Sequence, residues 1–273
     1  MRSSLHWRQI NIRLSGDRAE AEHQAFTTIA PALIAAENEG LVSNWFFIRK
    51  NPWRIRYMPV TDAAAEQAEQ HLHDATVALC RGGYVTQPVQ AVYEPETRAF
   101  GGTAAMTVAH DLFHADSKNI FVHLDPNNST NGTSYGRRET SLLLCGALMR
   151  GARQDPFECG DIWDKVSALR TPQPTPGKAT WDAFTASVVR LVTIDTRPTT
   201  KLRAQALRRI DPWLTAFEST GDALWCLADS GHLTRGLRSV IAHHVIFHWN
   251  RMGIDVTSQA NLAHAAASGI FSD

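Results

Sequence analysis

Tyr93, Glu94, Glu96 and Arg98 are the side chains whose types and spacing best suit chemistry. They stand directly before a glycine pair at 101–102, in the stretch YEPETRAFGG. Glycines at a turn let the backbone and a substrate approach each other closely. A carboxylate beside a tyrosine can act as a general acid or base when burial shifts its pKa. A structural alternative is equally open, in which Glu96 pairs with Arg98.

Two arginines are the second candidate. Arg54 and Arg56 are two positions apart in the aromatic-rich segment WFFIRKNPWRIRYMP, so on a strand they project from the same face. Two guanidinium groups can hold a carboxylate, a phosphate or a peptide carbonyl through forked hydrogen-bond donors. The alternative is a solvated sheet face, or pairing with Glu94 and Glu96.

Histidines occur in two clusters, of which the first holds His110 and His114. These two are four residues apart and share one helical face. No HExxH or similar pattern surrounds them, so we expect no metal site there. We expect both histidines on the solvent face of a helix over 103–116, which Asp116 and Ser117 close as a C-terminal cap.

The second histidine cluster lies in SVIAHHVIFHWNRMG at 239–253. His244 and His248 share one helix face there, beside Asn250 and Arg251. These side chains could supply an acid, a base and hydrogen-bond donors to a pocket. The alternative for each histidine is a core residue with structural partners.

Five of the eight tryptophans are candidates either for the core or for the wall of a groove. An exposed indole face could stack on heteroaromatic rings of a ligand. The five are Trp163, Trp181, Trp213, Trp225 and Trp249.

The elements that position these residues follow from hydrophobic periodicity and turn signals. We expect strand, helix, hairpin, helix and strand at 7–14, 17–39, 45–49 with 53–58, 61–81 and 84–93. Further helices are predicted at 103–116, 139–152, 178–195, 200–218, 221–228 and 234–252. A loop at 123–138 and a proline-rich linker at 170–177 interrupt them. The predicted fold class is α+β, with antiparallel strands and helices over about 1–102, a mainly helical part over about 103–273, and a single domain across 1–273.

Composition excludes several classes of function. Lys+Arg and Asp+Glu balance at 27 each, so no overall field favours nucleic acid or an anionic membrane. The four cysteines form no CxxC pair and match no zinc spacing, which indicates free thiols in a reducing compartment. The chain has no signal-peptide core, no membrane-length apolar run, no GxGxxG and no Walker A motif. We therefore expect a cytoplasmic protein with no metal, no cofactor, no nucleic acid and no membrane partner.

The segment 93–117, YEPETRAFGGTAAMTVAHDLFHADS, resembles a signature of the C-terminal elimination domain of lantibiotic dehydratases. The same signature occurs in free-standing thiopeptide enzymes that build a central pyridine ring. The resemblance covers most of the chain and is strongest over 45–58, 93–117 and 239–253. It implies that this chain is a single elimination-domain-like unit.

The resemblance implies an activity as well, that of a stand-alone thiopeptide pyridine synthase. Its substrate would be a ribosomally made precursor peptide with a leader, azole rings and two dehydroalanines. A formal [4+2] cycloaddition would join the two dehydroalanines, and loss of water and of the leader would leave a pyridine in a macrocycle. The partners would be this precursor and other enzymes of the pathway, and the leader could add as a strand along 7–14.

Together with the chemistry above, the resemblance assigns candidate site residues. The predicted catalytic set is Arg54, Arg56, Tyr93, Glu96, Arg98, His244 and His248. The predicted substrate-binding set is Ser117, Trp163, Ser239, Trp249, Asn250 and Arg251.

The chain departs from the elimination-domain pattern at Ile246. In lantibiotic-type relatives a histidine four residues before the asparagine serves the elimination, and Ile246 takes that position here. This departure favours the pyridine-forming branch. Two alternatives stay open: a glutamyl-elimination domain that acts with a glutamylating partner, and a non-catalytic subunit that only binds the leader.

Overall fold

The computed structural model describes residues 6–50, 52–85, 88–124, 135–170 and 177–272. They form two compact units, one from Met1–Pro95 with Asp116–Thr130 and one from Glu96–Ala115 with Asn131–Asp273. The positions of the units relative to one another are not determined, so each is described by itself. Within the described ranges no helix combines the length and apolar character that a membrane crossing requires.

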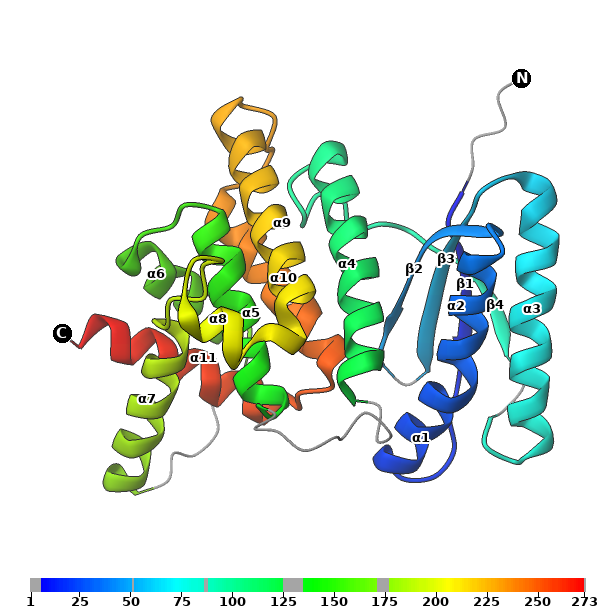
Figure 1. The fold of residues 1–273 in the computed structure, drawn as a ribbon, viewed down its shortest axis with the longest axis horizontal. Helices are drawn as coiled ribbons and strands as arrows, with labels where there is room; N and C mark the ends of the chain where they lie inside the picture. The colour runs from blue at the N-terminus through cyan, green and yellow to red at the C-terminus, as the bar shows by residue number, and fades with distance from the viewer. Residues whose placement is uncertain (1–5, 51, 86–87, 125–134, 171–176, 273) are drawn as a thin grey trace. The chain divides into compact units, whose positions relative to one another are not determined.

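A four-stranded antiparallel sheet is the centre of the first unit (Figure 1). Its strands run in the order β2-β3-β1-β4 and are β1 (Arg8–Ile12), β2 (Val42–Ile48), β3 (Trp53–Pro59) and β4 (Val89–Val92). The predicted hairpin is confirmed, since β2 pairs with β3. The expectation that a leader adds along 7–14 is wrong, because β1 is bonded to β3 on one side and to β4 on the other and has no free edge.

Helices cover one face of this sheet (Figure 1). The helix predicted over 17–39 is present as α1 (Arg18–Gln24), a π-helical turn η1 (Ala25–Ile29) and α2 (Ala30–Asn38). Asp17 caps it by accepting a hydrogen bond from the Glu20 backbone N–H at 2.9 Å. α3 (Asp62–Arg81) follows its N-cap Thr61, and α2 and α3 pack on β2 and β3.

Helix α4 (Thr103–Leu124) is longer than the sequence predicts. The expected end at 116 with Asp116 and Ser117 as a cap is wrong, because both residues lie within the helix and are fully buried. Ile120 and Phe121 extend the buried face by another turn, so the helix continues. The Ser117 hydroxyl accepts a hydrogen bond from the Phe47 backbone N–H at 3.4 Å, beside strand β2.

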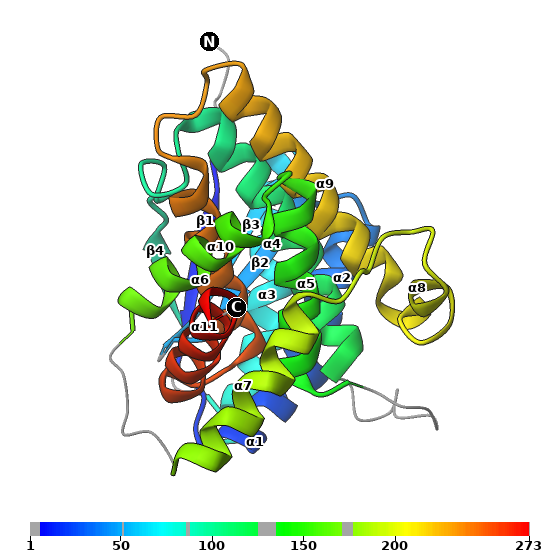
Figure 2. The same cartoon turned by 90° about the vertical axis from the view of Figure 1, so that its left-hand side faces the viewer.

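The second unit is helical (Figure 2). Its remaining elements are α5 (Arg137–Gly151), α6 (Pro156–Ala168), α7 (Lys178–Val192), α8 (Lys201–Gln205), the 3-10 turn η3 (Arg208–Ile210), α9 (Asp211–Asp229), α10 (Leu237–Met252) and α11 (Val256–Phe271). α5 packs against α9, and α11 packs against α6 and α7. The predicted fold class, α+β with a mainly helical C-terminal part, is confirmed.

Several boundaries differ from the predictions, for local reasons. The strand expected over 84–93 is only β4, with an isolated bridge between Leu14 and Val85. The break expected between 218 and 221 is absent, because Gly221 lies inside α9 against the backbone of α5. α6 and α11 were not predicted, although Asp155 forms a capping box and Asp255 caps α11. The prediction of free cysteines is confirmed for all four.

Candidate functional site

Arg56 on β3 is the most elaborately held of the predicted site residues. Its side chain is buried, and its Nε donates to Gln9 Oε1 at 2.7 Å. The guanidinium carbon lies 4.1 Å from the centroid of the Tyr93 ring and 5.3 Å from that of Phe46. Trp7 packs edge-on against both rings. A guanidinium among aromatic faces keeps its charge while losing water, which strengthens its hold on an anion or a carbonyl.

Strand register places Arg54 on the same sheet face as Arg56, as predicted. Arg54 pairs in register with Asn11 of β1 and Ile48 of β2, and Arg56 with Gln9 and Phe46. Arg54 is half-buried, and the Gln9 amide donates to Asn11 Oδ1 at 2.9 Å. Two arginines and two amides therefore form a row of donors along this face, which suits recognition of a peptide backbone or a carboxylate.

Tyr57 lies on the opposite face of β3 from Arg56. Burial, with a contribution from the charge of Glu69, raises the pKa of Tyr57 to about 12. Its phenol therefore stays neutral at physiological pH and belongs to the buried side of the sheet.

The turn at 96–102 belongs to the second unit. The Glu96 carboxylate lies 3.2 Å from Nε2 of His243, on α10. Arg98 is exposed, and in the described structure it forms no ion pair with Glu96, so the structural alternative that paired them is wrong. Gly101 and Gly102 have φ of 90° and 111°, conformations that favour glycine. The turn is tied to the start of α10 by Thr234 N–H donating to Gly101 O at 2.8 Å.

Phe100 links this turn to the histidines of α10. Its buried ring lies 5.0 Å from the ring of His243 and 4.8 Å from that of His244. His244 is 1% exposed and also meets Phe113. His244 is thus enclosed by aromatic rings, whereas His243 reaches the surface beside Glu96.

His248 lies one turn further along α10 and is fully buried. Its Nε2 is 2.7 Å from the hydroxyl oxygen of Ser141 on α5. The rings of Trp213 and Phe217 on α9 flank it at 6.0 and 5.0 Å. The interpretation of His248 as a core residue is therefore favoured. Any effect of His248 on a reaction must act through the residues that it contacts.

The predicted substrate-binding residues separate into buried and accessible ones. Trp163 and Trp249 are fully buried and stack on each other at 5.8 Å, which favours the core interpretation for both. Arg251 is also buried, with its guanidinium 4.4 Å from the centroid of Phe113. Asn250 accepts a hydrogen bond from Gln259 at 3.1 Å. Ser239 is half-buried at a groove beside α6.

Ile246, the position of the departure, is buried in α10 and lies between His244 and His248 in the sequence. An alkyl side chain can neither give nor take a proton, so the helix retains His243 as its accessible titratable group in this region.

Sequence reasoning missed residues that complete these arrangements. Gln9, Phe46 and Trp7 lie around Arg56 and its aromatic neighbours. The only hint in the sequence was that these residues belong to predicted strands that could pair with the strand of Arg54 and Arg56. Ser141 is 107 residues from His248 and had no signal. His243 was passed over because its neighbour in the sequence shares a helix face with His248.

The groups present suit binding and proton transfer. In the described part of the chain no three His, Cys, Asp or Glu side chains gather as a metal site. The first unit offers forked cationic donors at Arg54 and Arg56. The second offers a carboxylate-imidazole pair, Glu96 with His243.

Comparison with known proteins bears on what these groups do. A family profile described as "Lantibiotic biosynthesis dehydratase C-term" matches residues 7–269. A search of curated proteins gives no match.

Solved structures share the fold at low identity. The tRNA-dependent lantibiotic dehydratase MibB from Microbispora sp. 107891 is similar at 17% identity and a TM-score of 0.62, over 97% of this chain but only 28% of the MibB chain. TsrL is similar at 15% identity and a TM-score of 0.65, over 97% of this chain and 95% of its own. TbtD, a pyridine synthase from thiomuracin biosynthesis, is similar at 13% identity and a TM-score of 0.64, over 98% of both chains.

Proposed function

Because this chain belongs to the lantibiotic biosynthesis dehydratase C-terminal family, we propose that it modifies a ribosomally made peptide by forming a pyridine ring. The observation that carries the proposal is the likeness to the pyridine synthase TbtD along the whole of both chains. The likeness to MibB spans 28% of that larger protein. The apolar Ile246, in place of the histidine of elimination domains, supports the same branch.

The proposed reaction joins two dehydroalanines of one leader-bearing, azole-containing peptide. One dehydroalanine, with the imidic tautomer of its preceding amide, supplies four ring atoms as a 2-azadiene. The other supplies two carbons, and a formal [4+2] closure makes the six-membered nitrogen ring. Loss of water and expulsion of the leader as a peptide amide then give the aromatic pyridine. No step is an oxidation or a reduction, so the sequence of bonds balances without an electron acceptor.

Most of the catalysis in such a reaction would come from orientation. Two alkenes far apart in a flexible peptide must be held in contact, and good orientation can contribute about 7–11 kcal/mol to the barrier. The row of donors on the sheet face, Gln9, Asn11, Arg54 and Arg56, suits the binding of an extended peptide backbone. A guanidinium near the amide oxygen would assist formation of the imidic tautomer, because that oxygen gains negative charge while the amide N–H proton leaves and before the oxygen takes up a proton.

Proton transfer is the second requirement. The pair of Glu96 and His243 lies at the surface of the second unit and can take and return a proton during loss of water and leader. Tyr93, packed against Arg56, is a further hydrogen-bond donor. His244 and His248 are buried, so we assign them the positioning of α10 rather than direct contact with the substrate.

The experiment is incubation of the protein with a leader-bearing, azole-containing precursor that holds two dehydroalanines, followed by mass spectrometry. The proposal expects a macrocycle and a free leader amide. The matched control is the same precursor with one dehydroalanine replaced by alanine, which should stay unchanged because one ring partner is missing. An unchanged doubly dehydrated precursor would refute the proposal.

The likeness to MibB supports one second candidate, glutamyl elimination. In that reaction the same arginines would hold the glutamate that leaves an esterified serine. A glutamylated peptide offered to the protein would then release free glutamate, and the product would gain a dehydroalanine. Binding of the leader without either product would instead identify a non-catalytic subunit.

A further inference from the structure

A groove of about 490 Å³ lies in the second unit, at the C-terminal end of α5 and outside the residues assigned to the reaction. Three arginines line it, Arg150, Arg153 and Arg197, together with Glu218 and Asp222. Arginine is the residue that best matches carboxylates and phosphates, so the question is which of these guanidinium groups is already neutralised.

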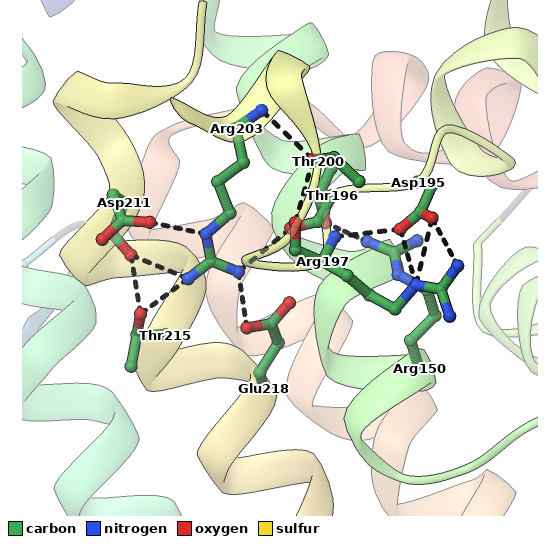
Figure 3. A network of polar contacts seen from close by, with 9 residues as sticks. All are labelled: Arg150, Asp195, Thr196, Arg197, Thr200, Arg203, Asp211, Thr215 and Glu218. Carbon is green, nitrogen blue, oxygen red and sulfur yellow. Dashed lines mark hydrogen bonds and ion pairs between the residues drawn. The ribbon is translucent and has the colours of Figure 1, made fainter. Parts of the chain in front are cut away.

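Two acidic residues around the groove, Asp195 and Glu218, have cationic partners (Figure 3). Asp195 binds Arg197 at 2.6 Å, and this pairing lowers the pKa of Asp195 to about 2. Glu218 binds the buried Arg203 at 2.6 Å. Arg203 is held further by Asp211, the Thr215 hydroxyl and the Thr196 carbonyl.

Asp222 is also paired, with Arg153 at 3.2 Å. Each acidic side chain around the groove is therefore already paired with another arginine. These carboxylates neutralise the charge of Arg150 only in part.

Arg150 is the cation that lacks a carboxylate partner. Within the described structure its only hydrogen bond goes from Nη2 to the Thr196 hydroxyl, which is neutral (Figure 3). Its Nε is buried without a partner. Burial lowers the pKa of Arg150, against the opposing charges of Glu218 and Asp195. A buried guanidinium without an anionic partner is costly, and an anion bound in the groove would lower that cost.

Arg153, beside it, has a strained backbone. Its φ is 57°, the left-handed conformation that a helix C-terminus usually gives to glycine. The strained residue nevertheless carries a long side chain, whose guanidinium lies 3.3 Å from the ring centroid of Trp225. Strain of this kind is found where a side chain is needed in one place. Two independent features therefore lie in one groove: an Arg150 guanidinium without a carboxylate partner, and an Arg153 backbone in a strained conformation.

We propose that this groove binds a carboxylate side chain of an acidic peptide segment. A carboxylate is planar and singly charged, so it matches the fork of one guanidinium. A phosphate dianion would meet more repulsion from Glu218 and Asp222, which line the same groove. The inference that the acid belongs to the precursor peptide rests on the proposed function.

The test is calorimetric titration of the full chain with an acetylated, amidated peptide of glutamates and, separately, with its glutamine counterpart. We expect heat of binding from the first peptide only. Arg150→Gln should weaken binding by about tenfold or more, the loss of one charge-assisted contact. The same variant should unfold near the parent temperature, because it removes a guanidinium whose Nε is buried without a partner. Arg208→Ala, at an exposed arginine outside the groove, should bind as the parent does.

Several outcomes would overturn the proposal. Equal binding of the two peptides would show that the charge is not recognised, and unchanged binding by Arg150→Gln would place the peptide elsewhere. Tighter binding of inorganic phosphate than of the glutamate peptide would contradict a site for a single charge. The assay involves no ring formation, so its failure is distinct from failure of the proposed enzyme activity.

Discussion

The crossing of α5 and α9 gives the sharpest prediction. Gly151 at the end of α5 and Gly221 in α9 meet there with no space for a side chain. A Cβ on Gly221 would lie 2.2 Å from the Leu148 carbonyl oxygen and 2.6 Å from the Ala152 nitrogen. Ordinary contact begins at 3.4 Å, so Gly221→Ala requires a local separation of about 1.2 Å at the Leu148 oxygen.

The cost can be worked from this geometry. Overpacking usually costs about 1–3 kcal/mol, and the upper end applies because the obstructing atoms are backbone and cannot rotate away. Alanine in place of a helical glycine returns about 1 kcal/mol. We therefore expect Gly221→Ala to lower the free energy of unfolding by about 2 kcal/mol, which corresponds to a melting temperature roughly 4–8 °C lower.

The same separation should reach His248. Its hydroxyl partner Ser141 is on α5, and its ring neighbours Trp213 and Phe217 are on α9. Moving the two helices apart must lengthen one of these contacts, so the ring signals of His248 in an NMR spectrum should shift in Gly221→Ala.

Thermal and urea unfolding, with Gly236→Ala as a control, check the prediction. Gly236 precedes α10 with open space around its Cα, so alanine there should change stability little. A Cβ on Gly151 would meet the Glu218 carbonyl at 2.2 Å across the same crossing. The double variant at 151 and 221 should therefore lose less than the sum of the single losses, since one separation relieves both. Parent-like unfolding of Gly221→Ala, or full additivity, would refute the reasoning.

Three further predictions concern single side chains. Arg56→Lys should slow the proposed ring formation by at least about tenfold, because the forked donor is lost. Thermal unfolding should change little, because the ammonium stays over the aromatic rings. A parent-like rate would contradict the role assigned to Arg56. Cys226 is exposed and should react with an aromatic disulfide reagent at about pH 8. Burial raises the pKa of Cys159 to about 11, so Cys159 should stay unlabelled. Peptide mass spectrometry would show which cysteine carries the label. Although burial acts to raise the pKa of Asp255, hydrogen bonds from Ser258 outweigh it and lower the pKa below the ordinary value of an aspartate. The carboxylate therefore stabilises the fold above its unfolded pKa, and this stabilisation is lost as pH falls through the folded pKa. Asp255→Ala should cost about 1 kcal/mol in urea unfolding at neutral pH and less in acid, and an equal cost in acid would count against the capping role.

Local rules were sufficient for much of the fold. The alternation of WRIRYMP placed Arg54 and Arg56 on one sheet face, and register confirms it. The helices predicted from residues 17 and 61 are both present, and the Asp17 and Thr61 side chains each accept a capping backbone hydrogen bond. These features depend on residues within one turn of one another, so a sequence window contains all the information they need.

Local rules failed where a distant partner changes the balance. Asp116 and Ser117 are common at helix ends, yet they continue α4, because Ser117 meets the backbone of β2 from 70 residues away. Gly221 ordinarily favours a break, yet it continues α9, because only glycine lets that helix approach α5.

By itself, the sequence determined the fold class, the family and the types of residue that could do chemistry. Tertiary structure alone decided that Tyr93 and Phe46 enclose Arg56, that Glu96 pairs with His243 rather than with Arg98, and that His248 is buried on Ser141. The physical reason is that helix and strand periodicity are set by near neighbours. The partners of a buried charge or ring are chosen by packing between segments far apart in the chain.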